Sequence, residues 1–236
     1  MRTISPRWSD LALTFLGVEL ALASFVVAPL AVLAPKNGVA LPLLVIALVA
    51  VPVLLAAVLV ASASGPAVSG VFVAGGFVLS GLIYGLRGPS VIVTYLHLIG
   101  ALVLGTALMV AVARAVFGPG PITYHRLTGA AVLYLLIGWT FAGVYGTLGL
   151  LLSHPFNGMP PREDGAAVVA HSLYYSFMAL TTAGLGDVTP AHPVIRGLTN
   201  LETVVGQIFP ATVIARILSL AVASKERHGS GGLDPE

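Results

Sequence analysis

The chain has 236 residues, of which 57% are hydrophobic and 8% charged, and its mean hydropathy is +1.00. Its long apolar runs exceed what the core helices of a soluble protein need, so the composition indicates a membrane protein and excludes a soluble globular domain. The formal net charge of +2 comes from few ionisable groups and forms no basic patch for nucleic acid, and a chain without cysteine has no disulfide or thiolate metal site.

Six windows of about 20 apolar residues predict membrane-spanning helices. They lie at roughly 11–34, 39–61, 67–86, 90–113, 127–152 and 194–223. The breaks between them are mostly short and rich in Gly and Pro, so we expect neighbouring helices to pack antiparallel. The first span follows Arg2 and Arg7, but its apolar run is longer than the core of a signal peptide, so we expect it to be retained.

The basic residues predict the orientation of the spans, because cytoplasmic loops carry an excess of Lys and Arg. With a cytoplasmic N-terminus, the larger group of basic residues falls inside and the smaller group outside. The inner group is Arg2, Arg7, Arg114, Arg126, Lys225 and Arg227, and the outer group is Lys36, Arg87 and Arg162. We therefore expect a multi-pass protein of a plasma membrane with both termini in the cytoplasm.

A seventh apolar segment, 166–180, is too short to cross the bilayer. As a helix, about 15 residues reach roughly 22 Å, against roughly 30 Å of hydrocarbon. We therefore expect this segment to enter the membrane and turn back. The stretch that follows, MALTTAGLGDVTP from Met178 to Pro190, then runs at membrane depth, where non-helical backbone is tolerated only if it is buried in protein or lines water.

The segment Thr181–Asp187 suits a row of backbone oxygen ligands. Gly184 and Gly186 stand two residues apart, which permits positive φ at every second residue and turns successive carbonyl oxygens to one side. Rings of such oxygens replace the water around a monovalent cation, and the Thr182 hydroxyl can add a ligand at the inner end. One chain supplies a quarter of each ring, so we expect four chains. The plainer reading, two turn glycines between helices, is disfavoured by the half-helix before them and the aspartate after them.

The motif TTAGLGD at 181–187 resembles the potassium-channel filter signature TTVGYGD. The preceding LYYSFMAL looks like the pore helix of that family, and NLETVVGQIFPATVIARIL is similar to the inner helix of simple bacterial potassium channels. The resemblance covers roughly 127–223 and leaves 1–120 unexplained. It implies a homotetramer in a lipid bilayer that conducts K⁺ passively, with K⁺ ions in the filter and no organic cofactor.

The resemblance also implies roles for individual residues. K⁺ would be held at Thr182, Ala183, Gly184, Leu185 and Gly186, flanked by Thr181 and Asp187. The filter would be supported by Tyr174, Tyr175, Met178 and Glu202, and the inner helix would bend for gating at Gly206 and Pro210. Gly206 follows Asp187 by nineteen residues, as in that family.

Two departures from the family affect the filter. Leu185 stands where the family usually has Tyr or Phe, a variation that also resembles the second pore loop of two-pore-domain potassium channels, and leucine packs without hydrogen-bonding. Met178 stands where many relatives have a carboxylate that holds the aspartate matching Asp187, so we expect the Tyr174 hydroxyl, a backbone N–H or water to donate to Asp187 instead. A weakly selective K⁺/Na⁺ channel is therefore the alternative to a K⁺-selective one.

Several other residues allow two interpretations each. Gly206 can be a hinge or a close-packing point of two helices, although Pro210 removes a backbone hydrogen bond four residues later and favours a bend. Glu202 is expected to support structure rather than conduct, and His97 to pack in its span. His171 lies near the expected outer mouth, where its titration can alter the field felt by cations, but a plain surface histidine is the simpler interpretation.

Six spans with a pore between the last two are the layout of voltage-gated channels, but a sensor needs several arginines in its fourth span. Here the fourth span offers Arg114 near its end, so we expect no strong voltage dependence. We divide the chain into a four-helix transmembrane region at 1–120 of unknown role, a pore module at 121–224 and a disordered cytoplasmic tail at 225–236. Whether a separate regulatory subunit exists is open.

We therefore predict an all-α membrane protein with six transmembrane helices and a re-entrant pore helix and selectivity filter between helices five and six. A distant alternative is a membrane-embedded enzyme, which needs a nucleophile–base pair or a metal cluster at membrane depth. The spans contain no HExxH motif and no paired aspartates. We therefore expect an ion channel without enzymatic activity and without a nucleic-acid partner.

Overall fold

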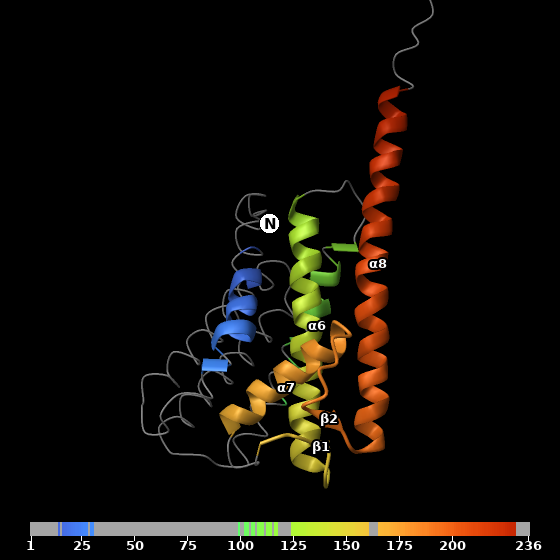
Figure 1. The fold of residues 1–236 in the computed structure, drawn as a ribbon. Coiled ribbons are helices and arrows are strands. Elements are labelled where there is room, and N and C mark those ends of the chain that lie inside the picture. The colour runs from blue at the N-terminus through green and yellow to red at the C-terminus, as the bar shows by residue number, and fades with distance from the viewer. Residues whose placement is uncertain are drawn as a thin grey trace, which may run out of the picture.

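The computed structural model of the chain describes most of residues 14–30 and 99–117, and all of 124–160 and 165–229. Within these residues the chain is mostly helical (Figure 1). The predicted spans at 39–61 and 67–86, and His97 in the fourth span, lie outside the described residues. The number of spans in the N-terminal region therefore stays a prediction.

The predicted first and fourth spans are helical wherever the structure describes them. The first contains a π-helix, η1 (Ala23–Val27), and the fourth is helical at its described positions from Ile99 to Phe117, beyond the predicted end at 113. A π-helix places one extra residue in a helical turn and often marks a functional contact. Here η1 packs against the later part of the chain, where the ring of Phe25 lies 5.2 Å from that of Phe177.

Three helices form the C-terminal half: α6 (Tyr124–Leu151), α7 (Gly165–Leu180) and α8 (Pro193–Gly229). The long helices α6 and α8 run side by side, and the short α7 lies obliquely across the lower half of α6 and also contacts α8 (Figure 1). These bounds match the predicted segments 127–152, 166–180 and 194–223, except at the end of α8. Residues 225–229 continue that helix instead of beginning a disordered tail, because the Lys, Glu and Arg with which this stretch begins favour helix.

One helix among the described residues is long and apolar enough to cross a membrane, the part of α6 from Arg126 to Leu151. The apolar part of α7, Ala167–Leu180, is shorter. This difference in length agrees with the expectation that α6 spans the bilayer and α7 does not.

Two short strands connect the loop after α6 to the segment before α8. β1 (Phe156–Asn157) pairs antiparallel with β2 (Thr189–Pro190), with Phe156 opposite Pro190. The backbone N–H groups of Ala191 and His192 both donate to the carbonyl of Pro155 and extend this connection. The pairing fixes the chain just after the TTAGLGD motif, and the sequence analysis did not predict it.

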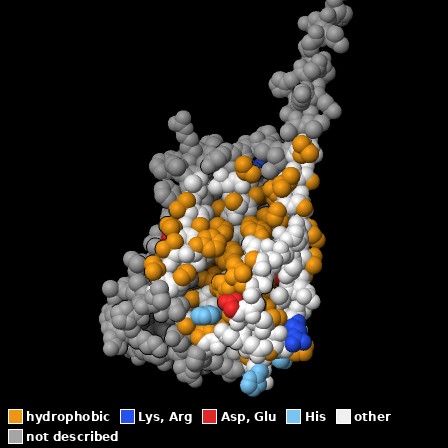
Figure 2. All heavy atoms as spheres, viewed as in Figure 1, with side chains coloured by type: hydrophobic (Ala, Val, Ile, Leu, Met, Phe, Trp, Pro, Cys, Tyr) orange, Lys and Arg blue, Asp and Glu red, His pale blue; other side chains and the backbone are white. Residues whose placement is uncertain are grey.

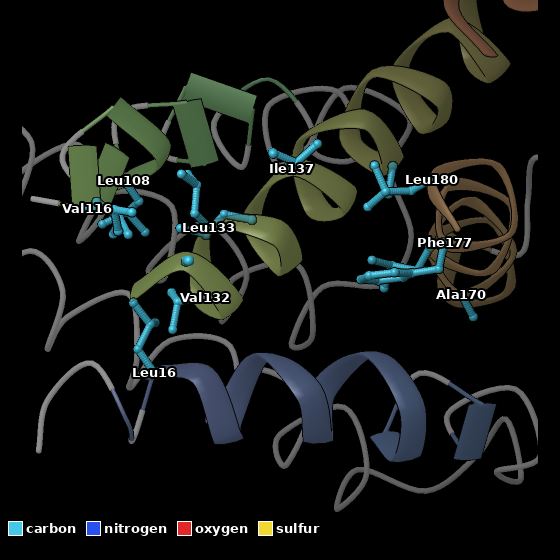
Figure 3. Packing of buried hydrophobic residues seen from close by; sticks show 14 residues of the cluster. Leu16, Leu108, Val116, Val132, Leu133, Ile137, Ala170, Phe177 and Leu180 are labelled. Carbon is cyan, nitrogen blue, oxygen red and sulfur yellow. The ribbon is translucent and has the colours of Figure 1, made fainter. Parts of the chain in front are cut away.

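The larger hydrophobic core joins the N-terminal spans to α6 and α7 (Figure 3). Leu16 of the first span and Leu108 and Val116 of the fourth lie in one buried cluster with Val132 of α6 and Phe177 of α7. The N-terminal region therefore packs directly on the helices that position the motif.

A second, aromatic cluster lies at the end of the fold that carries β1 and β2. Tyr145 of α6, Phe156 of β1 and Tyr175 of α7 meet edge to face, with ring centroids 4.9–5.9 Å apart. Ile195 of α8 is fully buried beside them. Edge-to-face pairs add to the stability given by burial alone, so this cluster holds α7 and α8 firmly at one end.

Candidate functional site

The backbone after α7 alternates between two conformations. Thr182, Gly184 and Gly186 have φ values of 60°, 51° and 84°, while Ala183 and Leu185 between them are not left-handed. The positive φ expected at the two glycines is observed, and Thr182 adds a third position. A left-handed residue with a side chain costs roughly 1–2 kcal/mol, so the contacts around Thr182 must hold it.

We refer to the segment Thr181–Asp187 as the strand. The last turn of α7 closes onto the start of this strand. The backbone N–H groups of Thr181, Thr182 and Gly184 donate to carbonyls of Phe177, Ala179 and Met178 at 3.0, 3.0 and 3.3 Å. Met178, which the resemblance placed among the filter supports, therefore holds the strand through its backbone carbonyl. The strand leaves the C-terminal end of α7, where the helix dipole carries partial negative charge.

Hydroxyl groups from the two long helices bind the terminal carbonyls of α7. Tyr134 of α6 donates to the carbonyl of Leu180 at 3.2 Å, and Thr203 of α8 donates to that of Ala179 at 3.3 Å. Gly206 of α8 lies against the same Leu180 carbonyl, and a Cβ at this position would collide with it. Gly206 is thus a close-packing point between α8 and the start of the strand.

The Thr182 hydroxyl lies between a carbonyl and an amide. It donates to the carbonyl of Thr181 at 2.6 Å and accepts a hydrogen bond from Nε2 of Gln207 at 3.1 Å. The sequence analysis did not select Gln207. An amide next to Gly206 in an apolar stretch of the span was the signal that could have found it, because polar groups within spans rarely face lipid.

A second hydrogen bond holds the far end of the strand. The hydroxyl of Tyr174 in α7 donates to Oδ1 of Asp187 at 2.8 Å, the contact that we expected from the sequence. This hydrogen bond holds the pKa of the Asp187 carboxyl below its ordinary value of 3.8, with smaller effects from the backbone N–H groups of Asp187 and Val188 and from the nearby His171. Asp187 therefore stays ionised at the end of the strand in neutral solution.

Behind the strand, Glu202 of α8 is buried completely and joins three helices. Its Oε2 accepts a hydrogen bond from the hydroxyl of Tyr145 in α6 at 2.7 Å, and its Oε1 lies 2.5 Å from Oγ of Ser176 in α7. Tyr175, another expected support, hydrogen-bonds to Oγ1 of Thr199 in α8 at 2.6 Å. Tyr175 thus joins α7 to α8 and does not contact the strand through its hydroxyl.

The strand itself is open on one side in the single chain. All residues from Thr181 to Asp187 are exposed, and the side chain of Leu185 is 71% exposed. Large apolar side chains of α8 are exposed as well, among them Leu201, Val204 and Ile208. Hydrophobic side chains cover much of the face along α6 and α8, while charged and histidine side chains gather toward the end that carries β1 and β2 (Figure 2).

This arrangement defines a class of protein. A half-helix beside a membrane-spanning helix ends in a strand of alternating conformation, and such backbone cannot face lipid at membrane depth. Among the residues that the structure describes, no three His, Asp or Glu side chains are grouped to hold a divalent metal. The fold and the strand are those of a pore-loop ion channel.

Comparison with known proteins identifies the family. Residues 122–223 match the family described as "Ion channel". The chain is 33% identical over 100 residues to Protein LctB of Geobacillus stearothermophilus, in an alignment that covers 39% of this chain and 73% of that protein. No solved structure matches the chain significantly. The chain belongs to the potassium-channel pore-loop family of ion channels, and it is a membrane protein.

Proposed function

We propose that the chain forms a homotetrameric channel that conducts K⁺ passively and selectively through a filter lined by backbone oxygens. The observation that carries this proposal is the left-handed conformation at Thr182, Gly184 and Gly186, alternating with Ala183 and Leu185, in a strand that leaves a half-helix. This alternation turns successive carbonyls to one side, and four such strands around an axis form rings that replace the hydration shell of K⁺. The K⁺ ions bind between Thr182 and Gly186.

The exposed surface of the single chain supports a tetramer. The segment Thr181–Asp187 cannot face lipid, because its backbone groups would have no partners there. In a fourfold assembly this segment lines the axis, and the exposed apolar side chains of α8 have other copies or lipid to contact. A closed ring of identical subunits is the usual symmetry of such an assembly.

The proposed location is a bacterial inner (plasma) membrane, with several spans and with both termini in the cytoplasm. In this orientation Asp187 lies at the outer end of the filter, and the basic residues Lys225 and Arg227 at the end of α8 lie inside. The excess of positive charge on the cytoplasmic side supports this orientation.

The test is a reversal-potential measurement on purified protein in planar bilayers or liposomes under opposed K⁺ and Na⁺ gradients. We expect the reversal potential to lie near the K⁺ equilibrium potential. Protein-free membranes provide the first control. An inactive variant, Gly184→Ala, provides the second, because its filter strand is expected to be strained. Absence of cation current from well-folded wild-type protein contradicts the proposal.

A weakly selective cation channel is a second candidate, and Leu185 is the observation that favours it. The side chain of Leu185 is 71% exposed and cannot hydrogen-bond, so it gives the filter no polar support from outside. A less rigid filter discriminates less between K⁺ and Na⁺, because its rings of oxygen atoms can adapt to either ion. A reversal potential midway between the two equilibrium potentials would favour this candidate, and Leu185→Tyr would then be expected to move it toward K⁺.

A further inference from the structure

Three fully buried side chains form a polar group behind the filter. Glu202 of α8, Ser176 of α7 and Tyr145 of α6 each have an exposed fraction of 0–2%. Oγ of Ser176 lies 2.5 Å from Oε1 of Glu202 and 2.7 Å from the carbonyl oxygen of Gly138 in α6. The hydroxyl of Tyr145 lies 2.7 Å from Oε2 of Glu202.

The number of protons in this group depends on the state of Glu202. A serine hydroxyl has one proton to donate, and a carbonyl or an ionised carboxylate has none. If Glu202 is ionised, the single proton of Ser176 must serve two oxygens, the carbonyl of Gly138 and Oε1 of Glu202. One of two short oxygen–oxygen contacts is then left without a proton between its atoms, which is repulsive.

A protonated Glu202 removes this conflict. Its own O–H can then donate to Oγ of Ser176, Ser176 can donate to the carbonyl of Gly138, and Tyr145 can still donate to Oε2. Every polar atom of the group has a partner and every short contact has a proton. Both partners of the Glu202 carboxyl among the described residues are hydroxyls, and an ionised carboxylate without a cation is costly in such a buried site.

We propose that Glu202 is a neutral carboxylic acid that donates its proton to Ser176 and thereby positions the pore helix α7 relative to α6 and α8. Its role in positioning the filter rests on the function proposed above, whereas its protonation does not. Ser176 lies on the last turns of α7, close to the carbonyls that hold the start of the filter strand. Gly138 also lies beside α7, because a Cβ there would touch the ring of Phe177. The carboxyl group therefore fixes the end of α7 from which the filter begins.

The first test is spectroscopic and does not require conduction. Infrared difference spectra between wild-type protein and Glu202→Gln, both in lipid at neutral pH, report the group that the substitution removes. We expect the loss of the carbonyl-stretch band of a protonated carboxylic acid, with a shift on ¹³C labelling of glutamate. Glu19→Gln serves as the control, since Glu19 is another glutamate in a predicted span and is only partly buried. Loss of carboxylate bands in Glu202→Gln would overturn the proposal.

The second test compares three substitutions by K⁺ current. Gln carries an N–H₂ that can donate to Ser176 and a carbonyl that can accept from Tyr145, so Glu202→Gln should keep the current within about twofold of wild type. Met has a similar length and no polar group at its end, so Glu202→Met should lower the current by about tenfold, a factor that corresponds to about 1.4 kcal/mol. Asp is too short to reach both hydroxyls, so Glu202→Asp should resemble Met.

The outcomes separate the possible roles of Glu202. Wild-type current in both the Gln and the Met variants would mean that Glu202 only fills space, and would overturn the positioning role. A Gln variant as impaired as the Met variant would mean that the negative charge is required, and would overturn the neutral state. Native mass spectrometry of each variant confirms that the assembly is intact. If wild-type protein carries no current, the proposed function fails, while the infrared result still decides the protonation of Glu202.

Discussion

The hydroxyl of Tyr174 lies 2.8 Å from Oδ1 of Asp187, so a hydrogen bond joins α7 to the far end of the strand Thr181–Asp187, which we propose to be the filter. Leu185 and Met178, at two positions where many members of the family have a polar support for this end, offer no polar side chain here. Leu185 is exposed and apolar, and Met178 contacts the strand through its backbone carbonyl. The end of the strand at Asp187 therefore depends on Tyr174, on the backbone N–H groups of Asp187 and Val188, and on the β1–β2 pairing just beyond it.

The first prediction concerns this hydrogen bond. Tyr174→Phe removes the donor and keeps the ring, so the filter should lose its conducting shape more readily when K⁺ is scarce. We expect currents that run down several-fold faster at low K⁺ and a weaker preference for K⁺ over Na⁺, with assembly unchanged. Tyr175→Phe is the matched control, because the hydroxyl of Tyr175 bonds to Thr199 instead of the strand. Stable, fully selective current from Tyr174→Phe would show that Asp187 is held elsewhere.

The second prediction is a pH dependence of the same contact. The hydrogen bond from Tyr174 is the main cause that lowers the pKa of Asp187 below 3.8, so the ionised form is favoured in the folded channel. A group with a depressed pKa stabilises the fold at neutral pH and loses this effect as the pH falls through its folded pKa. The midpoint at which external acid reduces wild-type current through Asp187 should therefore lie below pH 3.8.

In Tyr174→Phe the pKa of Asp187 should rise toward its ordinary value, so acid should reduce the current at a higher pH than in wild type. His171→Gln should shift the acid midpoint in the same direction by less, because the charge of His171 is the smallest of the effects on Asp187. Currents titrated with external pH measure both shifts. An unchanged midpoint in Tyr174→Phe would contradict the assignment.

The third prediction concerns the filter backbone. Gly184 has a φ of 51°, and a Cβ added there meets no atom within 4 Å, so the effect of Gly184→Ala comes from the backbone conformation alone. The left-handed conformation costs roughly 1–2 kcal/mol in each subunit for a residue with a side chain. We expect K⁺ current to be abolished while the tetramer persists. Gly197→Ala is the control, since a Cβ on this residue of α8 also meets nothing within 4 Å and Gly197 is helical.

The fourth prediction concerns assembly. One chain contributes one filter strand with an exposed side, and four are needed to surround an ion. Native mass spectrometry in detergent or nanodiscs should show a tetramer. A monomer or dimer that conducts after its mass has been confirmed would contradict this stoichiometry.

The sequence predicted the helices of the pore module closely, because apolar length and glycine spacing are local signals. It also selected Asp187 and its donor Tyr174, which are thirteen residues apart. The partners that it missed come from distant segments: Ser176 with Glu202, and Tyr134 with the carbonyl of Leu180. Hydrophobic periodicity reports which face of a helix is apolar, but not which hydroxyl on one helix reaches a group on another.

Gly206 illustrates the same limit. From the sequence, a glycine in an apolar helix serves equally well as a hinge or as a packing point. The structure shows the packing contact directly, because the carbonyl of Leu180 occupies the space that a Cβ at Gly206 would need. The bending role of Gly206 and Pro210 stays a prediction, and the contact changes how it must be tested.

The C-terminal half of α8 also contacts the N-terminal region. The guanidinium of Arg216 donates to the carbonyl of Phe117 at 3.1 Å and lies 5.4 Å from the centre of its ring. The Phe117 ring also meets that of Phe209 at 6.4 Å. Because Phe209 precedes Pro210, the helical stretch that extends beyond the predicted fourth span to Phe117 touches α8 where a bend is expected.

The last prediction separates bending from packing in α8. Pro210 has no N–H for the carbonyl of Gly206 four residues earlier, so Pro210→Ala restores a helical hydrogen bond and stiffens the helix there. If opening needs a bend, Pro210→Ala should lower the single-channel open probability and leave K⁺ selectivity unchanged. Gly206→Ala should instead act at the filter, because its Cβ must displace the Leu180 carbonyl at a cost of roughly 1–3 kcal/mol. Gly206→Ala should weaken selectivity or the stability of the tetramer, whatever the open probability of the channel.

Arg216→Gln should alter the open probability if the N-terminal region acts on this bend, since the substitution removes the charge that lies over the ring of Phe117. An open probability that is the same in wild type and Pro210→Ala would mean that α8 does not bend to open, and that any gate lies in the filter.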